Sequence, residues 1–455
     1  MKKIIFLFFA FWSVSAFAQS NYTLYNMTSV PQRLAINPAA KPDCKWYFGT
    51  PAMSATGLEF TSNGIQLKKF NDAFFQETNS DKYTLDISKL SEMLSKETYI
   101  NLDVNQEWLN AGFRLGNNMF FANVTEKVKT RTSLPGDFFK FVFEGNGGDN
   151  LGYDFAFNFG VDVLHTREYA LGYNRTLLGD RLTVGGRLKY VQGMNILNFA
   201  KNDMIFTTDP ESYKYTLKAD IEVNASSPFL NNLDSLNVLN AVLGSPSNAG
   251  WGIDAGASFN LTKRLNISAS VVDVGQIVWR QDVVNYKSKN PGAEFEFRGL
   301  DAKEFLGDNS DYEEAFKSLG DTVLTVFDLD SSNNSFTTGL LGQFYLGANY
   351  SILKNHNAGI LLYGSFYNKQ LYPAATLSWN SKFRRILGVS VSYTMMRGNF
   401  ANAGLGLSLN MGPEQFYFVS DNVIGAGIGN YKNVGLLFGW NHVFGRKKLA
   451  KKDDK

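Results

Sequence analysis

The sequence predicts an all-β protein: a transmembrane outer-membrane barrel of about 14 antiparallel strands, with an N-terminal arm or plug and short helices in its loops. Between residues 335 and 445, aromatic-rich segments of strand length follow one another with short connections. In them apolar residues alternate with Gly, Ala, Ser and Asn, so one face is apolar and the other small or polar. This alternation is typical of a sheet with lipid outside and a crowded or wet interior.

Composition favours the same class. Aromatic residues make up 15% of the 455 residues, Gly occurs 41 times, and charged residues account for only 19%. After the first 20 residues no apolar run reaches the roughly 20 residues that a membrane-spanning helix needs. The apolar content is divided among strand-length segments instead, which excludes a helical membrane protein.

The first 18 residues have the pattern of a Sec-type signal peptide. Lys2 and Lys3 precede an apolar run over residues 4–14, and Ala16-Phe17-Ala18 is a typical cleavage site. A single membrane helix is disfavoured because the apolar run is too short. We therefore expect export and localisation in the outer membrane.

The mature chain divides into three parts. Residues 19–105 are irregular, with a strand-like stretch at 46–48 and helical spacing at 88–96, and are predicted to form a periplasmic arm or plug with possible first strands. Residues 106–445 are predicted to form the transmembrane barrel. Residues 446–455 are a basic C-terminal tail, expected to be solvated.

The first barrel strands begin after residue 106. Residues 108–115 and 119–128 form a predicted hairpin across Gly116-Asn117-Asn118. Residues 137–143 are predicted to form a short amphipathic helix, and residues 151–163 a strand, because Tyr153, Phe155, Phe157 and Phe159 alternate. Further strands are expected at 169–176, 182–190, 253–261, 265–274, 344–350, 358–366, 371–379, 386–395, 403–409, 415–420 and 434–444.

Connection lengths predict an orientation. Short turns at 178–181, 262–264, 381–384 and 411–414 belong on the periplasmic side, where the last strand ends. Two long excursions, residues 198–250 and 286–337, then lie outside the cell, the first with a strand at 213–223 and the second with a helix at 302–319. They are expected to cap the barrel mouth.

The last strand is the predicted membrane-insertion strand, read by the barrel-assembly machinery. On its apolar face, expected to contact the lipid bilayer, lie Val434, Leu436, Phe438, Trp440 and Phe444. Other aromatic residues fall near predicted strand ends, where rings favour the level of the lipid headgroups. These residues are Trp279, Trp379, Tyr372 and Tyr417.

Asp273 is a carboxylate within the predicted strand 265–274. Its parity is opposite to that of Val272 and Val274, so it faces the lumen if those two valines face lipid. It then either pairs with a lumen cation such as Arg187 or lines a ligand path. Asp273 and Arg187 are thus candidate ligand-binding residues.

Four segments carry a family resemblance: Asn37-Pro38-Ala39, residues 270–275 (SVVDVG), residues 415–422 (QFYFVSDN) and the aromatic last strand. In these the chain resembles outer-membrane barrels of Bacteroidetes, a group with FadL-like transporters and PorV, and is similar to the PorP/SprF proteins of gliding and type IX secretion. The resemblance implies a FadL-type barrel of about 14 strands. It implies either a transport barrel or a secretion accessory with envelope protein partners.

Charge and motif content narrow the function. Without the signal peptide and the tail, the chain has 36 basic and 40 acidic residues, and this balance excludes a basic surface for nucleic acid. No cofactor or metal motif is found, because His165, His356 and His442 are far apart and Cys44 is the only cysteine. The first hypothesis is therefore a non-enzymatic barrel that transports or binds a hydrophobic or amphipathic small ligand. The alternatives are an accessory of type IX secretion or gliding, and an outer-membrane enzyme with a Ser–His pair.

Overall fold

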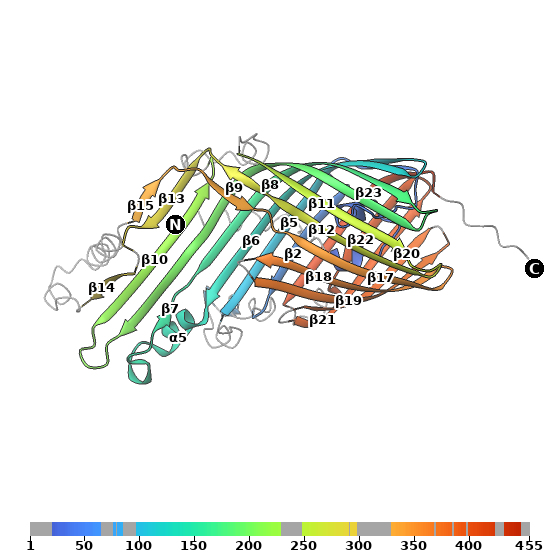
Figure 1. The fold of residues 1–455 in the computed structure, drawn as a ribbon. Helices are drawn as coiled ribbons and strands as arrows, with labels where there is room; N and C mark the ends of the chain where they lie inside the picture. Colours follow the sequence, from blue (N-terminus) through green and yellow to red (C-terminus); the bar gives the residue numbers. More distant parts are fainter. Residues whose placement is uncertain are drawn as a thin grey trace, which may run out of the picture.

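The chain forms a closed antiparallel barrel of 14 strands (Figure 1). The computed structural model describes residues 21–64, 76–78, 80–84, 97–228, 248–290, 292–297, 329–367, 370–384, 386–396, 399–423 and 432–446. No helix within these ranges is long and apolar enough to cross a membrane. The predicted helices at 88–96 and 302–319, the signal peptide and the residues after Arg446 lie outside the described residues.

Each barrel strand pairs with its neighbour in sequence, and the first closes on the last. The first strand consists of two pieces, β1 (Trp46–Gly49) and β2 (Ala55–Ser62), which both pair with β5 and with β23. The others follow in order: β5 (Glu97–Leu115), β6 (Asn118–Pro135), β8 (Gly160–Leu177), β9 (Leu182–Thr208), β11 (Asn248–Asn260), β12 (Leu265–Trp279), β17 (Gln343–Leu353), β18 (His356–Tyr367), β19 (Gln370–Phe383), β20 (Leu387–Met396), β21 (Asn399–Met411), β22 (Glu414–Ser420) and β23 (Asn433–Phe444).

The interruption between β1 and β2 does not open the wall. Residues 51–53 are exposed on the outside, yet the neighbouring strands keep their hydrogen bonds. Trp440 donates its N–H to Met53 O at 2.8 Å and accepts from Thr50 N–H at 2.9 Å, while Ala52 N–H bonds Trp108 O at 3.0 Å. An irregular stretch is tolerated in a membrane wall because its backbone groups are paired in this way.

Six short turns lie at one end of the barrel, together with the end of β23. They follow β5, β8, β11, β17, β19 and β21 and span two to four residues each. The four turns predicted for the short-turn side are among them, although the third begins at Arg384 because β19 continues to Phe383. Both long excursions begin and end at the opposite end, as expected for outer loops.

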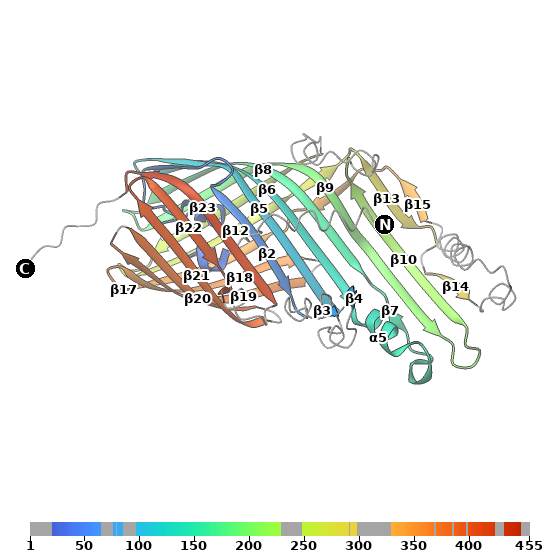
Figure 2. The same ribbon diagram turned by 180° about the vertical axis from the view of Figure 1, so that it is seen from behind.

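At the end opposite the short turns, named the outer end after the predicted orientation, the wall is much taller on one side. β9 has 27 residues, and its outer half leaves β11 and pairs with β10 (Tyr215–Ser226). β10 pairs in turn with β13 (Val283–Ser288) and β14 (Ala293–Phe297), and β13 pairs with β15 (Leu329–Ser332). Figure 2 shows this outer sheet projecting beyond the rim. At the same end, β16 (Phe336–Gly339) pairs with residues 276–279 of β12.

Residues 151–163 do not form the predicted single strand. The chain has a 3-10 turn at Gly148–Asn150, the short β7 (Phe155–Ala156) and then β8 from Gly160. Here the aromatic residues pack on helix α5 (Gly136–Glu144) instead of facing lipid: Phe141 lies edge-on to Phe155 and Phe206, with ring centroids 5.5 and 5.0 Å apart. The alternation of aromatic residues in the sequence therefore reflects packing in this local cluster and not a lipid-facing strand. The predicted helix at 137–143 corresponds to α5.

The two faces of β23 differ in exposure. Val434, Leu436, Phe438, Trp440 and Phe444 are half-buried on the outer face, whereas the alternate positions are buried inside. For three other aromatic residues the expected place at the headgroup level is wrong. Trp279 and Tyr417 are buried, and Tyr372 lines a cavity in the lumen, because these positions face inward.

We expect a charge at the middle of β23 to be costly and one at its end to be tolerated. Phe438→Arg should lower the free energy of unfolding by about 2–4 kcal/mol, because the outer face meets hydrocarbon there, and Phe444→Arg by about 0–1 kcal/mol. Urea unfolding in lipid vesicles measures both. Equal losses at the two depths would contradict contact of this face with lipid.

Candidate functional site

Residues 21–44, called here the inner segment, lie inside the barrel. They contain helix α2 (Asn21–Leu24) and the 3-10 helix η2 (Pro31–Ala35). The segment is hydrogen-bonded to several parts of the barrel wall. Thr23 N–H donates to Asp421, just after β22, at 2.8 Å, and Asn26 donates to Ser378 of β19 at 2.9 Å. Asn174 of β8 donates to Pro38 O at 2.8 Å. Such polar contacts on every side hold it across the lumen at the short-turn end.

Glycines make room for the inner segment. A Cβ at Gly185 would lie 2.4 Å from Pro38 O, and one at Gly256 would lie 2.2 Å from Asn37 Oδ1. Other inward glycines would bring a Cβ within 2.7 Å of a residue of the inner segment: Gly347 against Tyr25, Gly359 against Asn26, Gly404 against Thr23 and Gly406 against Met27. The small residues of the lumen face therefore give the inner segment its place.

Cys44 ends the inner segment as an inert thiol. It is buried beside Tyr47 and Val443, and burial raises the pKa of its thiol to about 12. A thiol with so high a pKa is not a nucleophile at neutral pH. The cysteine is part of the packing.

Between the inner segment and the outer end lies a cavity of about 520 Å³. Tyr99 of β5 and Tyr372 of β19 line it and lie edge to face, with ring centroids 6.2 Å apart. Its floor includes Tyr22, Gln32 and Ile36 of the inner segment. The volume falls in the range of small-molecule sites.

One wall of the cavity is aromatic and apolar. Tyr345 of β17 and Tyr363 of β18 have ring centroids 5.1 Å apart, and Tyr22 lies edge-on to Tyr363 at the same distance. Burial raises the pKa of Tyr22, with Tyr363 and the Glu59 carboxylate adding to the effect. Leu341 and Met396 also line the cavity.

The opposite wall is charged. Along β6, Lys127, Lys129 and Arg131 point inward at every second position. Arg131 is paired with Asp103 of β5, its Nη2 donating to Asp103 Oδ2 at 2.8 Å. Lys127 Nζ lies 2.8 Å from Glu168 and 3.2 Å from Asp273. A cavity with one charged and one aromatic wall is amphipathic.

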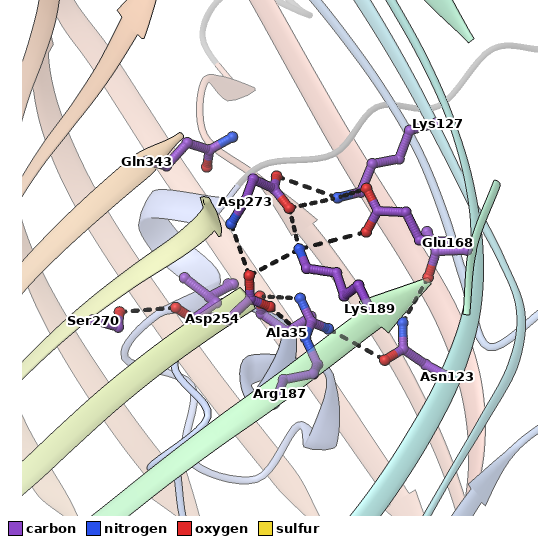
Figure 3. A network of polar contacts seen from close by, with 12 residues as sticks. Ala35, Asn123, Lys127, Glu168, Arg187, Lys189, Asp254, Ser270, Asp273 and Gln343 are labelled. Atoms are coloured by element: carbon purple, nitrogen blue, oxygen red, sulfur yellow. Dashed lines mark hydrogen bonds and ion pairs between the residues drawn. The ribbon is translucent and has the colours of Figure 1, made fainter. Parts of the chain in front are cut away.

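Below this wall the charges form a network over five adjacent strands (Figure 3). Asp254 of β11 is fully buried; it is paired with Arg187 directly opposite on β9, and its Oδ1 lies 2.8 Å from Lys189 Nζ. Lys189 also contacts Asp273 and lies 3.6 Å from Glu168. Buried charges are tolerated here because each has an opposite charge in contact.

Asp273 faces the lumen, as predicted, but the prediction that Val272 and Val274 share the opposite face is wrong for Val272. Val272 is 4% exposed and Val274 49% exposed, so they lie on opposite faces. A bulge explains the difference: Asp273 has a φ of +59°, and the β11–β12 register shifts there. Consecutive residues Val272 and Asp273 therefore both point inward.

The two candidate ligand-binding residues share one network without touching. Arg187 pairs with Asp254, and Asp254 accepts the N–H of Asp273 at 2.7 Å. Arg187 also donates to Ala35 O of the inner segment at 3.1 Å. Sequence reasoning missed Lys127, Lys189, Glu168 and Asp254. The available signal was that basic residues alternate with uncharged ones along residues 127–131, which indicates a charged face of the strand.

The three histidines lie in separate places. His165 contacts Glu126 at 2.6 Å, His442 contacts Glu414 at 2.9 Å, and His356 Nδ1 lies 2.9 Å from Ser381 Oγ at a short turn. Within the described ranges no group of three or more His, Cys, Asp or Glu residues is placed to hold a metal ion. These contacts bind polar side chains to one another along the strands.

Solved structures similar to this chain include outer-membrane channels. A ΔS2S3 mutant of the Pseudomonas putida monoaromatic hydrocarbon channel TodX is 10% identical, with a TM-score of 0.44 and coverage of 90% of this chain and 94% of that one. The CymD monoaromatic hydrocarbon channel is 8% identical, with a TM-score of 0.40 and coverages of 95% and 99%. The translocator domain of NalP from Neisseria meningitidis is 10% identical, with a TM-score of 0.34 and coverages of 95% and 100%.

At these identities the likeness concerns the fold alone. No curated protein matches the sequence. One family does match, over residues 38–421, which include the end of the inner segment from Pro38 and every strand from β1 to β22. The chain belongs to this family, DUF5723, a family of unknown function.

Proposed function

We propose that this protein is an outer-membrane barrel that binds a small amphipathic ligand in its lumen and transports it. The observation that carries the proposal is the cavity of about 520 Å³ with a charged wall on β5 and β6 and an aromatic wall on β17 and β18. A purely apolar ligand would leave Lys127, Lys129 and Arg131 facing hydrocarbon, which is unfavourable for charged groups. A ligand with one polar and one apolar part satisfies both walls.

Native mass spectrometry of protein extracted from its own membranes tests this. We expect a small molecule to co-purify with the wild type and to be lost when Asn101→Trp fills the cavity. Leu102→Trp is the matched control, because Leu102 is the next residue of β5 and is exposed on the outer face. Equal retention in both variants, or no bound molecule in the wild type, would contradict binding in the cavity.

A second candidate is an accessory role in type IX secretion or gliding, favoured by the outer sheet. β9, β10 and β13 extend the wall beyond the rim, with exposed charges such as Lys201 on β9 and Lys287 on β13. A surface of this kind fits an envelope protein partner. Shortening the β9–β10 hairpin should then abolish co-purification of a partner protein and leave ligand retention unchanged.

A further inference from the structure

Glu59 of β2 is a carboxylate that lines the cavity and forms no ion pair within the described ranges. Among the described residues its side chain accepts one hydrogen bond, from Thr61 Oγ1 at 3.3 Å, and no basic nitrogen lies within 4.0 Å of it. The neighbouring acids are compensated: Asp103, directly opposite on β5, is paired with Arg131, and Glu168 with Lys127. Glu59 thus lines the cavity without a basic group in contact among the described residues.

The aromatic wall faces this carboxylate across the lumen. Tyr363 lies on β18, six strands from β2 around the barrel, and Tyr22 packs edge-on against it from the inner segment. Glu59, Tyr22 and Tyr363 all line this one cavity. An isolated carboxylate opposite aromatic rings is the arrangement that proteins use for organic cations, which are attracted by the charge and by the faces of the rings.

The charge of the whole cavity points the same way. Six acidic side chains line it, Glu59, Asp103, Glu107, Asp162, Glu168 and Asp273, against four basic ones, Lys127, Lys129, Arg131 and Arg187. Three of the cations are held by carboxylates at contact distance, while Lys129 approaches Asp273 only to 3.9 Å. The excess of acidic over basic side chains favours a positive ligand group.

We propose that Glu59, Tyr22 and Tyr363 form a subsite for an organic ammonium group. This inference rests on the proposed function and names the polar part of its amphipathic ligand. A bare divalent cation is disfavoured, since calcium needs six to eight oxygen ligands and no group of three candidate ligands occurs among the described residues. A carboxylate group is disfavoured at this place, because it would stand beside the Glu59 carboxyl group, which has no basic group in contact within the described ranges.

Three probes with the same tail test the subsite: hexyltrimethylammonium, hexanoate and 1-hexanol. Binding is measured by calorimetry on the full-length protein in nanodiscs, with empty nanodiscs as the blank. We expect the ammonium probe to bind the wild type on the order of tenfold tighter than either of the others. Glu59→Gln should abolish this preference and leave the affinity for hexanol unchanged.

Two matched pairs separate direct contact from general effects. Asp162→Asn removes a carboxylate of the same cavity that already accepts hydrogen bonds from Asn198 and from Phe199 N–H, and should change the ammonium affinity less than about twofold. Tyr363→Phe keeps the aromatic face and should retain binding, whereas Tyr363→Leu should weaken the ammonium probe about fivefold. Heat-modifiable migration in gels confirms that each variant is folded.

The outcomes distinguish the two proposals. If none of the probes binds the wild type, both the subsite and the proposed function fail. If the probes bind but hexanoate is preferred, or the ammonium preference survives Glu59→Gln, the subsite alone is wrong. An equal loss in Asp162→Asn and Glu59→Gln also overturns it, because the effect would then come from net charge.

Discussion

Asp254→Ala should lower the free energy of unfolding by about 3–5 kcal/mol, among the largest losses expected for a single substitution in this chain. Asp254 is fully buried, pairs with Arg187 and Lys189, and accepts the N–H of Asp273. Its removal leaves two buried cations short of a counter-charge. Urea unfolding of the refolded protein in vesicles measures the loss.

Asp254→Asn and Asp220→Ala are the controls. Asn keeps an acceptor for the Asp273 N–H, so its loss should be smaller than that of Ala. Asp220 pairs with the exposed Lys201 on the outer sheet, and exposed pairs contribute only about 0–1 kcal/mol. If Asp254→Ala unfolds with the wild-type midpoint, the network does not stabilise the barrel.

Deletion of residues 21–42 should convert the barrel into an open channel. Barrels with more than about eight strands leave a lumen that side chains of the wall do not fill, and here the inner segment crosses it. We expect the permeability of proteoliposomes to a small sugar to rise on the order of tenfold or more. Liposome swelling measures it.

A point variant tests the same seal with the chain intact. Gly185→Val would place a Cβ 2.4 Å from Pro38 O and should displace the inner segment, raising permeability partially. Gly186→Val is its control, because a Cβ there meets nothing nearer than Asp254 O at 3.6 Å. A folded deletion variant as tight as the wild type would show that the segment is not the seal.

The strands were predictable because the membrane imposes a period of two on every one of them. The last strand, the hairpin around residues 116–118 and the short turns follow from that period and from turn residues alone. Where another element covers the aromatic side chains, the period of two leads to a wrong prediction of a lipid-facing strand. Phe155 and Phe157 alternate like a lipid-facing strand, yet they pack on Phe141 of α5.

The candidate site was only partly predictable, for a different physical reason. That Asp273 is a carboxylate in a strand marks it as inward, but its partners come from strands distant in sequence, so only the closed barrel brings Lys127 and Lys189 to it. The bulge at Asp273 cannot be derived from alternation, because a bulge is a local exception to it. Glu59 carried no signal beyond its charge.

The amide of Gln32 has a consequence for assembly. Its Nε2 donates to Glu107 of β5 at 3.1 Å and to Asn441 of β23 at 2.8 Å, so it joins both neighbours of the first strand across the closing seam. Before the first strand has paired with β23, Gln32 can reach Glu107 of β5 but not Asn441 of β23. The inner segment is therefore held firmly only after closure, which makes its seating a built-in check that the barrel has been completed.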